Sequence, residues 1–216
     1  FRDEDLRADR QPEFTQLDVE MSFATLDQIY SLIEGLFASV FKLINVDLPT
    51  PFPRFSFAEV MSRYGSDKPD LRIKGLELQD LSPALEGTEF PPFASALSSG
   101  GQVKGIVVPG GANLSRKVLD ELQEFAKRYG ATALPWIKLG DEVSSSLLKA
   151  LGADTVARIA EVAGASKGDL VLIVAGKSKI VAASLGALRN DVAKRENLIS
   201  ANVYAPLWVT DFPMFE

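Results

Sequence analysis

The residues at the start of the chain are those best suited to hold a nucleotide. Residues 1–20 read FRDEDLRADRQPEFTQLDVE, which combines guanidinium groups, an aromatic ring and several carboxylates. A guanidinium fork can bind a phosphate oxygen and a carboxylate oxygen together, and it stays charged at any working pH. We therefore expect a ligand site here, with Arg2 as its central cation.

Two strand-like runs would position these groups. In the run from Phe14 to Met21, alternation places Phe14, Gln16, Asp18 and Glu20 on one face and Leu17, Val19 and Met21 on the other. The first face is expected to meet a ligand and the second a core. In residues 1–4, Arg2 and Glu4 share a face. The pattern predicts a long antiparallel hairpin with a charged loop between its strands.

Three separated segments carry a family resemblance. The string Phe1-Arg2-Asp3-Glu4, followed by Arg10, Phe14 and Asp18, resembles motif 2 of class II aminoacyl-tRNA synthetases, in the form typical of aspartyl-tRNA synthetases. The strings YGSDKPDLR at 64–72 and WVTDFPMFE at 208–216 resemble bacterial members of that group. Their number and order make this resemblance specific.

The resemblance implies a role for each motif residue toward ATP. Arg2 is expected to contact the α-phosphate and the substrate carboxylate, which makes it the catalytic residue. Arg10 is expected to reach the γ-phosphate, Phe14 to stack on adenine, and Glu4 to accept from the adenine amino group. The complete ATP-binding set comprises Arg2, Asp3, Glu4, Arg10, Gln11 and Phe14.

The same resemblance implies an aspartate site made of Arg2, Gln16 and Asp18, with Asp18 holding the substrate ammonium. Glu20 is expected either to line this site or to form a structural ion pair. The charged residues of the loop are expected either to form solvated ion pairs or to contact the tRNA acceptor end. These residues are Arg7, Asp9 and Glu13.

The activity implied is that of an aspartate–tRNA ligase. ATP, as its Mg²⁺ complex, activates L-aspartate to aspartyl-adenylate, which is transferred to the 3′ end of tRNA(Asp), with tRNA(Asn) left open as a second acceptor. Such enzymes act as homodimers. The magnesium ligands, motif 1 and motif 3 are expected outside this sequence, so no metal site is expected within it, and a fragment of this kind is expected to be inactive alone.

Composition restricts the alternatives. The 216 residues have a net charge of −6 and contain neither cysteine nor histidine, which excludes thiolate metal sites and His- or Cys-based catalysis within the chain. No apolar run is long enough to cross a bilayer, so we expect a cytoplasmic protein. The sequence lacks an initial Met and starts inside a motif, which suggests an excerpt from a longer polypeptide.

The predicted fold class is α+β. Residues 1–75 are expected to be the motif 2 part of a class II antiparallel sheet with flanking helices. A helix capped by Thr25 and Gln28, with an apolar stripe continuing to Ile44, would pack on that sheet. A strand at 55–57 and a short helix to Tyr64, closed by Gly65, would follow.

Residues 76–200 are expected to form an inserted α/β domain that resembles the GAD module of bacterial aspartyl-tRNA synthetases. Residues 201–216 would return as a strand to the first domain. The elements predicted for the insert are strands at 103–109, 134–139 and 169–175, and helices at 115–129, 146–151, 154–163 and 178–198.

One motif is rejected and two rival functions remain. Ala175-Gly176-Lys177-Ser178 imitates the end of a P-loop, but Val171 stands where that motif requires glycine. The rivals are an asparaginyl-tRNA synthetase or related paralogue, and a non-catalytic RNA- or partner-binding module that carries a GAD domain.

Overall fold

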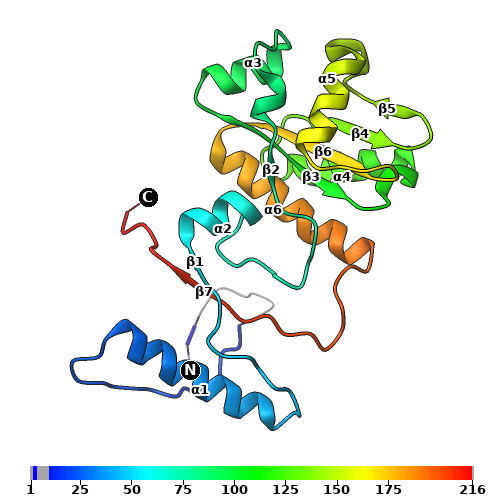
Figure 1. Cartoon of the computed structure of the whole chain (residues 1–216). Helices are drawn as coiled ribbons and strands as arrows, with labels where there is room; N and C mark the ends of the chain where they lie inside the picture. Colours follow the sequence, from blue (N-terminus) through cyan, green and yellow to red (C-terminus); the bar gives the residue numbers. More distant parts are fainter. Residues whose placement is uncertain (1, 4–9, 216) are drawn as a thin grey trace. The chain divides into compact units, whose positions relative to one another are not determined.

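The computed structural model describes residues 2–3 and 10–215 (Figure 1). The chain divides into two compact units, Phe1–Pro51 and Phe52–Glu216. Helices and a largely antiparallel set of strands make it an α+β structure, as the sequence predicts. No helix among the described residues is long and apolar enough to cross a membrane. The predicted domain boundary at 75/76 remains a prediction.

The first unit is built around α1 (Leu26–Lys42). Thr25 caps it as predicted: the Gln28 amide donates to the Thr25 hydroxyl at 3.4 Å, and the Thr25 amide donates to the Gln28 side chain at 2.9 Å. The predicted packing of its apolar stripe on a sheet is wrong for this chain. Phe37 is 44% exposed and Val40 51% exposed. The described part of the unit contains no strand on which the stripe could pack.

The second unit begins with β1 (Arg54–Ser56) and α2 (Phe57–Tyr64), where the sequence predicted a strand and a helix. Ser56 caps the helix, and Gly65 ends it in the left-handed conformation with φ 68°. The predicted return strand is β7 (Trp208–Thr210), which pairs with β1 in parallel, with Arg54 opposite Trp208. Among the described residues, the first strand, β1, and the last strand, β7, thus form one small sheet.

A five-stranded sheet forms the centre of the second unit, in the order β2-β3-β6-β4-β5. Its strands are β2 (Gln79–Asp80), β3 (Gln102–Val108), β4 (Trp136–Leu139), β5 (Val143–Ser145) and β6 (Leu170–Gly176). All neighbouring pairs are antiparallel. The α/β designation for residues 76–200 is therefore corrected, because alternating strands and helices here feed an antiparallel sheet rather than parallel crossovers.

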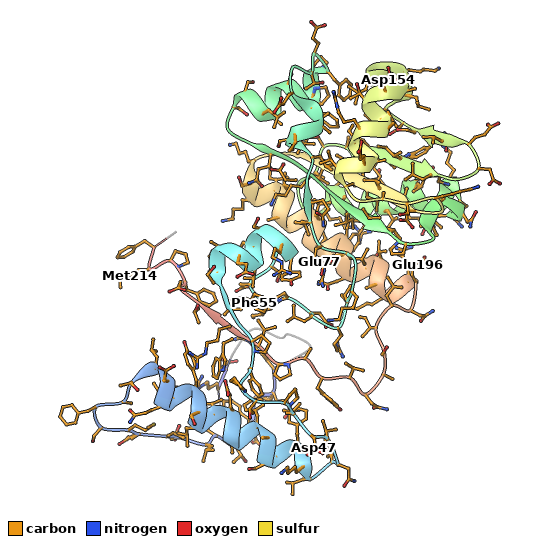
Figure 2. All side chains as sticks on the ribbon, in the orientation of Figure 1. Asp47, Phe55, Glu77, Asp154, Glu196 and Met214 are labelled. Carbon is orange, nitrogen blue, oxygen red and sulfur yellow. The ribbon has the colours of Figure 1, made fainter. Side chains whose placement is uncertain are left out.

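Helices cover both faces of this sheet (Figure 1). Leu170, Leu172 and Val174 of β6 pack on the side of α4 (Arg116–Lys127) and α6 (Ser178–Arg195). Val171 and Ile173 pack on the other side, with α3 (Pro91–Ser98) and α5 (Leu148–Val162). Successive side chains of a strand point to opposite faces, so β6 is apolar at every one of these positions. Figure 2 shows the side chains filling these layers.

The breaks within the predicted helical regions are also as expected. α5 contains the predicted interruption at Gly152, which has φ 77° and ψ 165° and is non-helical. Two short 3-10 helices complete the unit, Ser82–Leu85 and Gly111–Asn113.

A buried arginine of α6 holds the connection between α2 and β2. Arg189 is only 1% exposed, and its Nη2 donates to the carbonyl oxygens of Asp70 at 2.8 Å and Ile73 at 2.9 Å. Its guanidinium lies 5.0 Å from the centre of the Tyr64 ring. Burial lowers the pKa of Arg189, and its Nε has no hydrogen-bond partner among the described residues. Arg189 therefore fixes residues 70–73 from a distant helix.

Candidate functional site

The structure brings Arg2 and Phe14 together. The guanidinium carbon of Arg2 lies 5.6 Å from the centre of the Phe14 ring, a cation–π arrangement. The Arg2 amide donates to the Pro12 carbonyl at 3.0 Å, so the two sides of the expected hairpin are adjacent at this point. A cation suited to phosphate and a ring suited to base stacking are thus side by side, although they are 12 positions apart in the sequence.

The remaining predicted site residues that the structure describes are on the surface. Glu4 lies outside the described residues, as do Arg7 and Asp9 of the loop. Like Arg2 and Phe14, the other described members of the predicted set are exposed; they are Asp3, Arg10, Gln11, Gln16 and Asp18. The juxtaposition of Arg2 and Phe14 is therefore observed, whereas the roles of the other members remain predictions.

The predicted strands of the hairpin are not formed in the described residues. Residues 10–24 contain no strand, and Leu17 and Val19 of the expected core face are 71% and 51% exposed. The predicted strand from Phe14 to Met21 and the predicted burial of one of its faces are both wrong for this chain. A strand is stabilised by its ladder and by packing of one face, and a two-stranded hairpin alone is marginal in water. Alternation specifies which side chains share a face, but it cannot supply the surface that covers them.

The described acidic residues do not form a metal site. Within residues 2–3 and 10–215, no three carboxylates gather in a way that could hold a metal ion. The P-loop imitation is also explained by the fold. Gly176 ends β6 and Ser178 begins α6, with only Lys177 between them, so the strand leads directly into the helix.

The charged loop after α2 contains an ion pair between two of its own residues. Arg72 binds the Asp70 carboxylate through two of its nitrogens, with Nε to Oδ1 at 2.8 Å and Nη2 to Oδ2 at 2.6 Å. This hydrogen bonding lowers the pKa of the Asp70 carboxyl.

Sequence reasoning missed two buried cations, Arg189 and Lys104. Lys104 is 7% exposed, and its Nζ donates to the carbonyl and hydroxyl oxygens of Ser62, at 2.9 and 3.1 Å. Burial lowers its pKa. Lys104 lies within the apolar strand Gln102–Val108, and a charged residue inside such a run was the available signal.

Sequence comparison places these features in a class of proteins. The family model described as "tRNA synthetases class II (D, K and N)" matches residues 1–216. The match covers the whole chain, and the chain belongs to this family.

The similar curated proteins are more specific. The chain is 49% identical over 218 residues to "Aspartate--tRNA(Asp/Asn) ligase" of Thermoanaerobacter sp., covering 100% of this chain and 37% of that protein. It is 49% identical over 217 residues to "Aspartate--tRNA ligase" of Exiguobacterium sibiricum, covering 99% and 37%. It is 48% identical over 219 residues to "Aspartate--tRNA ligase" of Clostridium botulinum, covering 100% of this chain and 36% of that protein. The chain therefore spans little more than a third of the length of these relatives.

Proposed function

We propose that the chain is part of an aspartate–tRNA ligase, in which it supplies the motif that holds ATP and L-aspartate. The observation that carries this proposal is the juxtaposition of Arg2 and Phe14, at 5.6 Å, within a motif whose spacing matches the family. The names of the relatives support aspartate as the amino acid.

Activation of aspartate by ATP requires neutralisation of negative charge rather than proton transfer. An ionised carboxylate oxygen of aspartate attacks the α-phosphorus of ATP, and pyrophosphate leaves with its magnesium. The tRNA terminal hydroxyl then attacks the carbonyl carbon of the adenylate, and AMP leaves. Negative charge gathers at the α-phosphoryl group in the first step, so a fixed guanidinium there stabilises the transition state. Arg2 fulfils this role in the proposal.

The other members of the motif hold the substrates. Phe14 stacks on adenine, Glu4 accepts from the adenine amino group, and Arg10 binds the γ-phosphate. Asp3 and Gln11 complete the ATP site. Gln16 and Asp18 bind aspartate, with the Asp18 carboxylate on the substrate ammonium.

This assignment is tested by aspartate-dependent pyrophosphate exchange with the complete enzyme. Arg2→Ala is expected to lower exchange by roughly a hundredfold or more, the usual loss when one transition-state charge contact is removed. Phe14→Ala is expected to weaken ATP binding mainly, by about 1 to 3 kcal/mol. Arg116→Ala, which removes an exposed arginine at the start of α4, is the matched control. Exchange by Arg2→Ala within threefold of the parent would remove Arg2 from the site.

The domain division forms a further part of the proposal. We place the GAD-like insert at 76–200, between catalytic segments at 1–75 and 201–216. The cores on the two faces of the five-stranded sheet support this division, because their buried residues lie within 76–200 except for Ile73. Replacing the insert by a short Gly and Ser bridge is expected to leave aspartate activation within about tenfold, because closure entropy grows slowly with bridge length. A folded, dimeric variant that activates no aspartate would contradict the division.

The partners proposed are tRNA(Asp) and a second copy of the complete enzyme, in the cytoplasm. Relatives with and without tRNA(Asn) in their names are equally similar to the chain, so both tRNAs are candidates. Charging of each purified tRNA by the complete enzyme distinguishes the two cases.

A further inference from the structure

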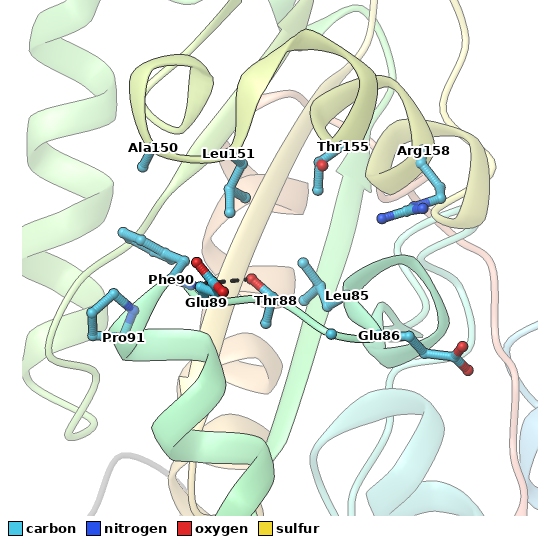
Figure 3. A pocket seen from close by; sticks show the side chains of 11 residues that line it. Leu85, Glu86, Thr88, Glu89, Phe90, Pro91, Ala150, Leu151, Thr155 and Arg158 are labelled. Atoms are coloured by element: carbon cyan, nitrogen blue, oxygen red, sulfur yellow. Dashed lines mark hydrogen bonds between the residues drawn. The ribbon is translucent and has the colours of Figure 1, made fainter.

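A pocket in the second unit is lined by none of the residues assigned to motif 2. It has a volume of about 480 Å³ and is formed between α5 and the segment from Leu85 to Pro91 (Figure 3). Two rows of side chains face each other across it. One row comes from α5 and includes Leu151, Thr155 and Arg158, while the other includes Glu89 and Phe90. The volume is in the range of small-molecule sites.

The guanidinium of Arg158 is held in place by a backbone carbonyl rather than by a carboxylate. Its Nε donates to the Ala84 carbonyl oxygen at 3.0 Å, which fixes the group at the pocket wall. Figure 3 shows the guanidinium directed along the α5 row toward Thr155. Within the part of the chain that the structure describes, Arg158 forms no ion pair, although two glutamates line the same pocket. Its Nη groups remain available to an anionic group.

The opposite row carries negative charge. The carboxylate of Glu89 lies beside Phe90, and the Thr88 hydroxyl next to it accepts from the Phe90 amide at 3.3 Å. Glu86 also lines the pocket, but Figure 3 shows its carboxylate directed away from the other side chains. The pocket therefore offers a cation on one wall and an anion on the other, and these two groups do not bind each other.

We propose that this pocket binds a free α-amino acid, with its carboxylate on Arg158 and its ammonium on Glu89. A purely anionic ligand would bring its charge close to the Glu89 carboxylate, and a purely cationic ligand would meet Arg158. A small zwitterion satisfies both walls, through charge-assisted hydrogen bonds. Leu151 and Phe90, both partly exposed, contribute apolar surface, whereas Leu85 is only 1% exposed and lies in the core behind the pocket.

The probe is L-leucine, titrated into the full chain and followed by calorimetry and by chemical-shift changes. Two matched compounds each lack one charge: L-leucinamide has no carboxylate, and isocaproate has no ammonium. We expect saturable binding of L-leucine and binding at least about tenfold weaker for both matched compounds, since each loses one charged hydrogen-bonding partner. Absence of L-leucine binding, or equal affinity for isocaproate, overturns the proposal.

Variants locate the site. Arg158→Met and Glu89→Gln are each expected to weaken L-leucine binding about tenfold or more, whereas Glu86→Gln leaves it unchanged. If Arg158→Met does not fold, Glu89→Gln and the matched compounds decide. Unchanged binding by a folded Glu89→Gln variant refutes the assignment. None of these positions belongs to motif 2, so pyrophosphate exchange by the complete enzyme tests the ligase proposal independently.

Discussion

The close contact between the end of α2 and α6 depends on two glycines that face each other, Gly65 and Gly186. Gly65 follows α2 with φ 68°, and a Cβ placed on it would lie 2.3 Å from the Ala182 carbonyl oxygen and 3.0 Å from the Gly186 amide nitrogen. Both atoms belong to the backbone of α6, so neither can rotate away. We predict that Gly65→Ala forces the two helices apart.

The expected magnitude has two parts. A non-glycine residue in the left-handed region costs roughly 1 to 2 kcal/mol. Overpacking against a rigid neighbour costs roughly another 1 to 3 kcal/mol. The free energy of unfolding should therefore fall by about 3 kcal/mol, a large share of the roughly 5 to 15 kcal/mol typical of a domain.

The assay is urea unfolding of the chain, followed by tryptophan fluorescence, with Gly164→Ala as the matched control. Gly164 also has a positive φ, 71°, just after a helix, but a Cβ there meets nothing within 4 Å. The control should lose only the conformational part, roughly 1 to 2 kcal/mol. Equal losses for the two variants would refute the argument from close helix contact, because only Gly65 faces a backbone.

Three further predictions concern buried or paired charges. Arg189→Leu leaves the Asp70 and Ile73 carbonyls without this donor and should lower the free energy of unfolding by about 3 kcal/mol in urea titrations; a loss under about 1 kcal/mol would contradict this. Burial lowers the pKa of Lys104 below its ordinary 10.5, so unfolding at alkaline pH binds a proton, and the free energy of unfolding should rise with pH toward 10.5. In Lys104→Met, unfolding curves at alkaline pH should lack this rise. Arg72 lowers the pKa of Asp70, so its stabilisation is complete above the ordinary 3.8 and is lost as pH falls through the lower folded value; an acid titration of Asp70→Asn should lack this dependence.

Much of the local structure could be predicted from the sequence. The cap at Thr25, the helix end at Gly65 and the interruption at Gly152 all occur where the sequence placed them. These features depend on the conformational preferences of single residues and on hydrogen bonds between neighbours, which short stretches of sequence contain. The members of motif 2 were likewise recognisable, because their spacing is itself the signal.

Only the tertiary structure decided how distant segments meet. The order β2-β3-β6-β4-β5 and its antiparallel pairing follow from the packing of both sheet faces, which no single strand contains. The contacts of Arg189 with carbonyls 119 and 116 positions away could not be read from α6, where an arginine ordinarily lies in solvent. Residues 14–21 and α1 each have an apolar face that the sequence predicted to be buried and that is exposed in the structure. Periodicity reports which side chains share a face, whereas burial depends on a partner surface that local sequence does not specify.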